Sequence, residues 1–138
     1  MADNFLPWLE SFQTSSDLIN KQNEQFITHI NGYLDRLQYI IRAEPRQEVL
    51  LELIESSLAL MERNFAVEEK LYTNHNYPMV TIHTIEHKNL LNYFRVLKTS
   101  LQTGKAIDIK NQIKAVSGLL SSHFTIFDRR ATLAISDK

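Results

Sequence analysis

The strongest constraint on the fold is the spacing of apolar residues, which recur every three or four positions along most of the chain. This spacing places them on one face of a helix, because an α-helix has about 3.6 residues per turn. Residues that interrupt helices are scarce, since glycine and proline each occur only three times in 138 residues. Long helices are therefore expected. Their predicted ranges are 15–42, 45–73, 79–101 and 108–129.

Four amphipathic helices joined by short loops predict an all-α fold, an up-down-up-down four-helix bundle. Residues 1–14 then form an irregular N-terminal arm, and the whole chain 1–138 is a single domain. Ser15 or Ser16 can cap the first helix, and Pro45 suits the first turn of the second.

Composition narrows the classes of partner and site. Cysteine is absent, which excludes disulfides and thiolate metal ligands. A formal net charge of −1 gives no reason to expect binding to nucleic acid or to an anionic membrane. No apolar run approaches about 18 residues, and the first residues, "MADNFLPWLESF", do not resemble a signal peptide. A cytoplasmic location is expected, while a protein partner is left open.

Polar residues also fall on the predicted inner faces of all four helices. In the second helix they continue the stripe begun by Leu50 and Ile54, and in the third they alternate with Val80 and Leu90. Antiparallel packing can bring these groups to one level of the bundle. The inward polar residues are Asn23, Asn64, Glu68, His83, His87, His123 and Asp128.

This group predicts a metal site. Buried charges must be paired or bound to metal, and three imidazoles with two carboxylates suit a first-row transition metal. His83 and His87, four residues apart, share a helix face and can bind one ion. Each motif alone is weak, because HxxxH is more often a solvated face and a lone inward Glu68 often reaches water. Their joint occurrence carries the prediction.

The sequence resembles the hemerythrin family, particularly the single-domain bacterial hemerythrins, over nearly its whole length. The likeness lies in Trp8 and in the stretches "DLINKQNEQF", "NFAVEEKL", "YPMVTIHTIEH" and "LLSSHFTIFD". In the family the last three stretches read HFxxEE, then YP with HxxxH, and HxxxxD. Family members hold two bridged irons with five histidines and two carboxylates.

The resemblance implies roles for individual residues. Glu68 and Asp128 occupy the positions of the bridging carboxylates, and His83, His87 and His123 those of the ligands of one iron. The two histidines of the other iron, to which dioxygen binds in the family, are here Asn23 and Asn64. The dioxygen pocket is expected to be lined by Leu120, with Leu119 in place of a tryptophan and Asn20 in place of an aspartate.

The leading hypothesis is a hemerythrin-like protein with a mononuclear metal site and a binding or sensing role, not an enzyme. Iron is the first choice of metal, with zinc or manganese as alternatives, and water or O₂ could occupy the remaining position. Reversible O₂ carriage is expected to be absent or impaired. Three alternatives stay open: a metal-free bundle acting as an interaction or structural protein, a conventional diiron O₂-binding protein, and redox or peroxide chemistry at a mononuclear iron.

Overall fold

The computed structural model describes residues 8–103 and 109–136, and its regular elements there are all helices. The N-terminal segment contains one short 3₁₀ turn, η1, at Glu10–Phe12. The long helices are α1 (Asp17–Leu37), α2 (Ala43–Asn74), α3 (Val80–Gln102) and α4 (Ile109–Ser122). A π-helical segment, η2 (His123–Asp128), joins α4 to the final helix α5 (Arg129–Ser136). Within these residues, no helix is both long and apolar enough to cross a membrane.

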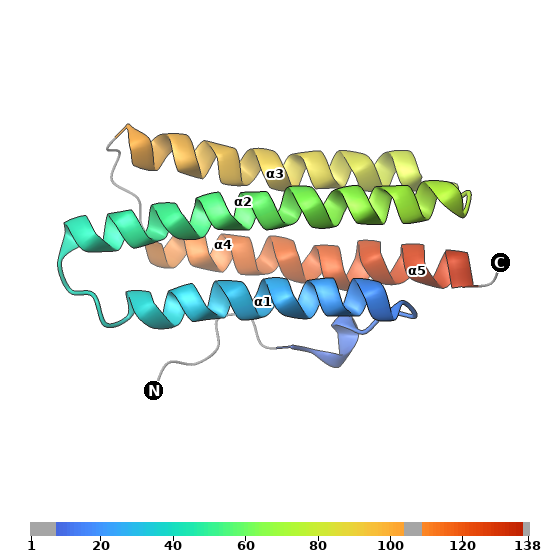
Figure 1. Ribbon diagram of the computed structural model, residues 1–138, viewed down its shortest axis with the longest axis horizontal. Helices are drawn as coiled ribbons and strands as arrows, with labels where there is room; N and C mark the ends of the chain where they lie inside the picture. Colours follow the sequence, from blue (N-terminus) through green and yellow to red (C-terminus); the bar gives the residue numbers. More distant parts are fainter. Residues whose placement is uncertain (1–7, 104–108, 137–138) are drawn as a thin grey trace.

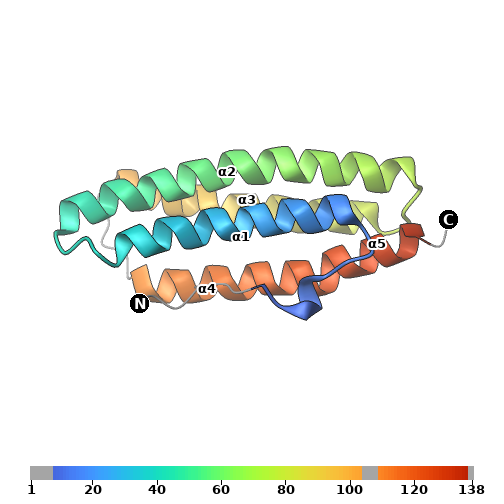
Figure 2. The same cartoon turned by 60° about the horizontal axis from the view of Figure 1, so that its bottom comes forward.

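Successive long helices run in opposite directions, and α4, η2 and α5 together form the fourth rod of the bundle (Figure 1). The α2 helix packs against both α1 and α3. The η1 turn lies on the outside of the fourth rod, where it contacts η2 (Figure 2). The predicted all-α, up-down-up-down four-helix bundle is confirmed.

Two predicted helix ends are wrong. The first helix ends at Leu37 rather than at residue 42, because the Arg46 guanidinium binds the carbonyls of Leu37 and Ile40 at 2.6 and 2.8 Å. The last rod continues beyond residue 129 to Ser136, since α5 buries Ala131 against Tyr72 and Tyr77. The other boundaries differ by one or two residues, and position 108, the expected start of the fourth helix, lies outside the described residues.

The cap of the first helix agrees with its prediction. The Ser16 side chain accepts a hydrogen bond from the Ile19 amide, which satisfies one of the free N–H groups at a helix start. Pro45 is the third residue of α2, where its missing N–H group removes no hydrogen bond within the helix.

Two apolar clusters fill the bundle at different levels. The larger contains Phe26, Met61 and Phe94. Phe12 of η1 also belongs to it, and its ring packs edge-on against Phe124 with 5.4 Å between the ring centroids. The smaller contains Tyr72, Tyr77 and Ala131. Histidines and carboxylates that are also buried belong to neither cluster, so they form a polar layer inside the bundle.

Candidate metal centre

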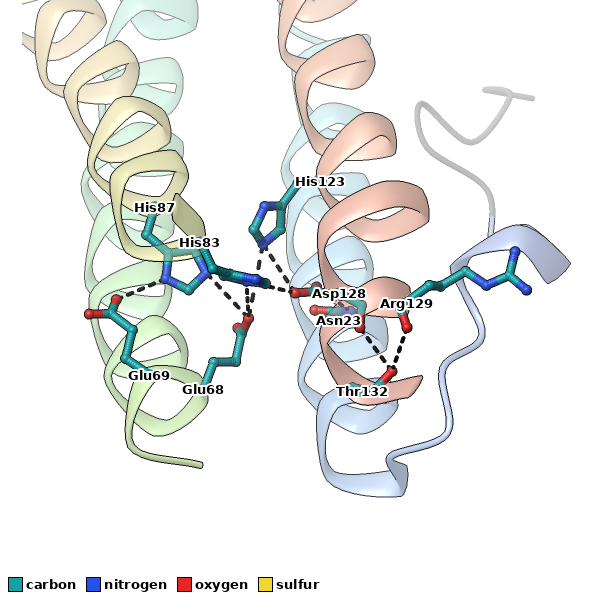
Figure 3. Close-up of polar contacts among 9 residues, drawn as sticks. All are labelled: Asn23, Glu68, Glu69, His83, His87, His123, Asp128, Arg129 and Thr132. Atoms are coloured by element: carbon teal, nitrogen blue, oxygen red, sulfur yellow. Dashed lines mark hydrogen bonds and ion pairs between the residues drawn. The ribbon is translucent and has the colours of Figure 1, made fainter. Parts of the chain in front are cut away.

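Five polar side chains from three of the four rods converge in this layer, and each is at most 2 % exposed. One ligand-capable atom from each lies within 4.8 Å of the corresponding atom of every other. Figure 3 shows the three imidazoles and two carboxylates pointing toward a common centre. The five residues are Glu68, His83, His87, His123 and Asp128. These are the same five residues that the sequence predicted as metal ligands.

The helices aim these side chains by simple geometry. On α3, His83 and His87 are separated by about one turn, so both face α2 and the bundle interior. The ring of Phe65 stacks flat on His87, with centroids 3.8 Å apart and planes 3° apart. Because Phe65 and Glu68 sit on the same side of α2, this stacking also fixes His87 against the carboxylate.

The remaining two ligands depend on the π-helical segment. In a regular α-helix, residues five apart point about 140° away from each other. The wider turn of η2, with its i to i+5 hydrogen bonds, brings His123 and Asp128 to the same side. As a result His123 Nε2 lies 3.3 Å from Asp128 Oδ1. Spacing alone did not predict this π turn.

Distances within the cluster are long for hydrogen bonds. Glu68 Oε1 lies 3.3 Å from His87 Nε2, 3.6 Å from His83 Nε2 and 3.9 Å from His123 Nε2. None of these four atoms, nor Asp128 Oδ1, has a hydrogen-bond partner although all are buried. Two ligands that each lie about 2.1 Å from one ion are separated by roughly 3–4 Å. The unpartnered atoms therefore have the spacing and chemistry of a metal-binding set.

Electrostatics in the layer follow the same arrangement. Burial alone would raise the pKa of Glu68, but the three imidazoles outweigh it and hold that pKa well below its usual value. Burial would lower the pKa of His123, yet the charge and close contact of Asp128, helped by Glu68, raise it to about 10. The pKa of His83 is likewise raised, since its contacts with Asp128 and Glu68 outweigh burial. Protons therefore take the place of a cation when none is bound.

A further carboxylate orients one of the imidazoles. Glu69 Oε2 lies 2.8 Å from His87 Nδ1, and Glu69 is one-third exposed at the edge of the layer. This contact fixes the proton on Nδ1 and leaves Nε2 free for a metal, as is common for metal-binding histidines. Sequence reasoning gave Glu69 no role, because a residue next to Glu68 on a helix points about 100° away from it. The one hint in the sequence was that Glu69 directly follows the predicted ligand Glu68.

Asn23 and Asn64, which the resemblance places where the family has two further histidines, lie beside the cluster. Asn23 Nδ2 donates to Asp128 Oδ2 at 3.1 Å, and both groups are buried. Asn64 is half-buried and lines a cavity together with Asn23, Glu68 and Leu120. The cavity has a water-accessible volume of about 10 Å³. That is close to the minimum, about 10–15 Å³, that one water molecule needs.

Two of the three predicted pocket residues are elsewhere. Leu120 lines the cavity as expected, but Leu119, its neighbour on the helix, points outward and is 37 % exposed. Asn20 is buried, yet its Oδ1 accepts from the Thr14 backbone amide and hydroxyl, both at 2.8 Å. Asn20 thus ties the N-terminal segment to α1 and does not line the cavity.

A buried phenol also lies beside the cluster. Tyr72 is fully buried, its ring lies 4.9 Å from that of His83, and its hydroxyl has no hydrogen-bond partner. Burial raises the pKa of Tyr72, and the charges of Asp128 and Glu68 raise it further, so the phenol is neutral. Its place one turn after Glu68 on α2 was the signal for this inward position.

The sequence matches no protein-family model and no curated protein. The candidate site is therefore defined by its own residues and geometry.

Proposed function

We propose that this protein is a hemerythrin-like metal-binding protein that holds one ion and serves in binding or sensing the metal or a small ligand on it. The proposal rests on the converging, buried and unpartnered ligand atoms of His83, His87, His123, Glu68 and Asp128. Nitrogen and oxygen ligands of this kind suit iron, which is our first choice, and also zinc or manganese.

The observation that favours one ion over two is the Asn23–Asp128 hydrogen bond. Asp128 Oδ1 faces the imidazoles, whereas Oδ2 receives the Asn23 amide at 3.1 Å. An amide N–H group cannot bind a metal, so it occupies the position in which a bridging carboxylate would contact a second ion. The adjacent cavity has room for about one water molecule and is lined by no further histidine besides His123.

Charge balance supports the same stoichiometry. Glu68 and Asp128 supply two negative charges to a layer that is at most 2 % exposed. One divalent cation with neutral imidazoles neutralises them, and a buried site with an excess of charge is costly. With five protein ligands, a six-coordinate ion has one position for water or another small ligand.

Reversible O₂ carriage would be absent or impaired under this proposal. In hemerythrins the two irons each supply one electron to bound dioxygen, and a single ion can supply only one. The role of the protein would then be to bind the metal or a small ligand on it. Unlike a redox enzyme, such a protein needs no groups that bind a substrate.

Metal analysis of the purified protein tests the proposal. After anaerobic reconstitution with iron(II) and removal of loosely bound ions, we expect about one iron per chain and no oxo-bridged diiron absorption on exposure to O₂. A His87→Ala variant should retain little iron, and a His29→Ala variant should retain it, because His29 bonds to Ser56 away from the layer. Two irons per chain with a bridged-diiron band would favour the conventional diiron carrier. Failure to retain any metal would favour the metal-free bundle.

A further inference from the structure

We propose that a small inorganic anion binds on the outer side of His83, between this imidazole and Arg130, and strengthens metal binding through the imidazole. The inference rests on the proposed function, because the anion acts on the metal through the His83 ring, whose Nε2 would bind it. The ligand class is a monovalent anion of about the size of chloride.

The site is a second cavity, separate from the one beside Asn23. It has a water-accessible volume of about 20 Å³, enough for one or two water-sized groups. It lies where α3 begins and η2 runs into α5, and Met79 and Ile82 at its edge are 41 % and 50 % exposed. Its lining residues are Tyr77, Met79, Ile82, His83, Phe127 and Arg130.

The buried polar group of this cavity is His83 Nδ1. It is shielded from solvent and has no hydrogen-bond partner. Nε2 of the same ring faces Glu68 and Asp128 at 3.6 and 3.3 Å, so the opposite ring edge, with Nδ1, is turned away from the metal position. A histidine that binds metal almost always donates its other N–H to an acceptor, as His87 does to Glu69. His83 needs such an acceptor, and the cavity can hold it.

The cavity supplies donors and a positive charge but no anionic acceptor. None of its six lining residues is acidic, and Arg130 contributes a guanidinium group. The arginine ion pairs among the described residues involve Arg36 and Arg95, so none engages Arg130. Its charge acts on Tyr77, where it opposes the rise in pKa that burial causes. A site with N–H donors, a cation and apolar walls selects an anion over a cation.

An anion here would act on the metal through one bond. When an acceptor takes the Nδ1–H hydrogen bond, the imidazole becomes a better electron donor at Nε2. Metal affinity should therefore rise with anion concentration. By thermodynamic linkage the bound metal should increase anion affinity by the same factor.

The test uses zinc-loaded protein labelled with ¹⁵N-histidine, in which each ring nitrogen gives its own NMR signal. Chloride is titrated at constant ionic strength against sulfate, a larger and divalent anion. We expect a saturable shift of His83 Nδ1 and no comparable shift of His87 Nδ1. The Arg130→Gln variant should bind chloride about tenfold more weakly, the loss expected for one charge-assisted hydrogen bond.

Arg129→Gln is the matched control, since the Arg129 side chain extends toward the N-terminal segment and away from the histidines (Figure 3). It should keep the wild-type response, and circular dichroism should show that both variants fold. Shifts of all three Nε2 signals that persist in Arg130→Gln would mean that chloride binds the metal directly, which overturns this inference. No saturable response in protein that holds one zinc overturns it too and leaves the proposed function intact. Failure to hold zinc overturns both.

Discussion

Restoring the two missing histidines is the most informative perturbation of the site. The double variant Asn23→His, Asn64→His should bind a second iron and become coloured on exposure to O₂. The expectation follows from the placement of Asn23 and Asn64, which border one cavity beside Glu68 and His123. New imidazoles at these positions would reach the cavity beside Glu68 and His123.

The structure also indicates how much folding stability the metal-free protein should lose through this change. Asn23→His removes the amide donor from Asp128 Oδ2, a buried charged acceptor. Losing a hydrogen bond to a charged group costs about 1.5–3 kcal/mol. For a chain of this length, that corresponds to a fall in Tm of roughly 5–15 °C. A second bound iron should offset this loss, so the Tm difference between metal-loaded and metal-free protein should be larger in the double variant than in wild type.

Iron content, visible absorption and calorimetry of both forms measure the outcome. The two single variants are the controls, because each supplies only one of the two new ligands and should gain little second iron. A double variant that folds, retains the first iron and still binds only one would refute the reasoning. The two asparagines would then not be the reason that the protein binds only one iron.

The remaining predictions concern orientation, protonation and the π turn. Glu69→Gln should lower metal affinity by about 10–100-fold at unchanged stoichiometry, as measured by competition with a chelator, whereas Glu62→Gln, which alters only an exposed pair with Arg95, should not. The raised pKa of His123 stabilises the metal-free fold fully below about pH 6.5, its unfolded value, and this contribution is lost as pH rises through about 10. The Tm of chelated protein should therefore fall between these pH values while that of metal-loaded protein changes less; parallel curves would contradict the assignment. Deleting Thr125 should convert η2 into a regular α-helical turn in which His123 and the aspartate are four residues apart and still share a face, so metal content should be largely kept; loss of the metal would show that the π turn itself is required.

Local helix geometry made much of the site predictable. His83 and His87 could be placed together because residues four apart on a helix always share a face. Glu68 was placed by continuing the apolar stripe of α2, and the structure finds it 1 % exposed. These positions depend only on the helical period, which can be read from the spacing of the apolar residues in the sequence.

The features that escaped prediction depend on departures from that period or on distant partners. The sequence predicted that His123 and Asp128 both face inward, but not the π turn that brings them together, since a regular helix would have separated them by about 140°. The Asn23–Asp128 bond joins residues 105 positions apart, so no local pattern could indicate it. The helical extension to Ser136 depends on the contact of α5 with Tyr72 and Tyr77, another long-range effect.

These long-range features bear directly on the stoichiometry we propose. The π turn orients Asp128 so that Oδ1 joins the imidazoles, and the other oxygen is thereby presented to α1. On α1 it meets an amide, which donates to a carboxylate without adding charge. Two carboxylates then require a total of two positive charges, supplied either by one divalent ion or, without metal, by protons on imidazoles whose pKa values are raised. A second divalent ion would exceed this balance and would need a bridging anion and new ligands, which the roughly one-water cavity beside Asn64 does not provide.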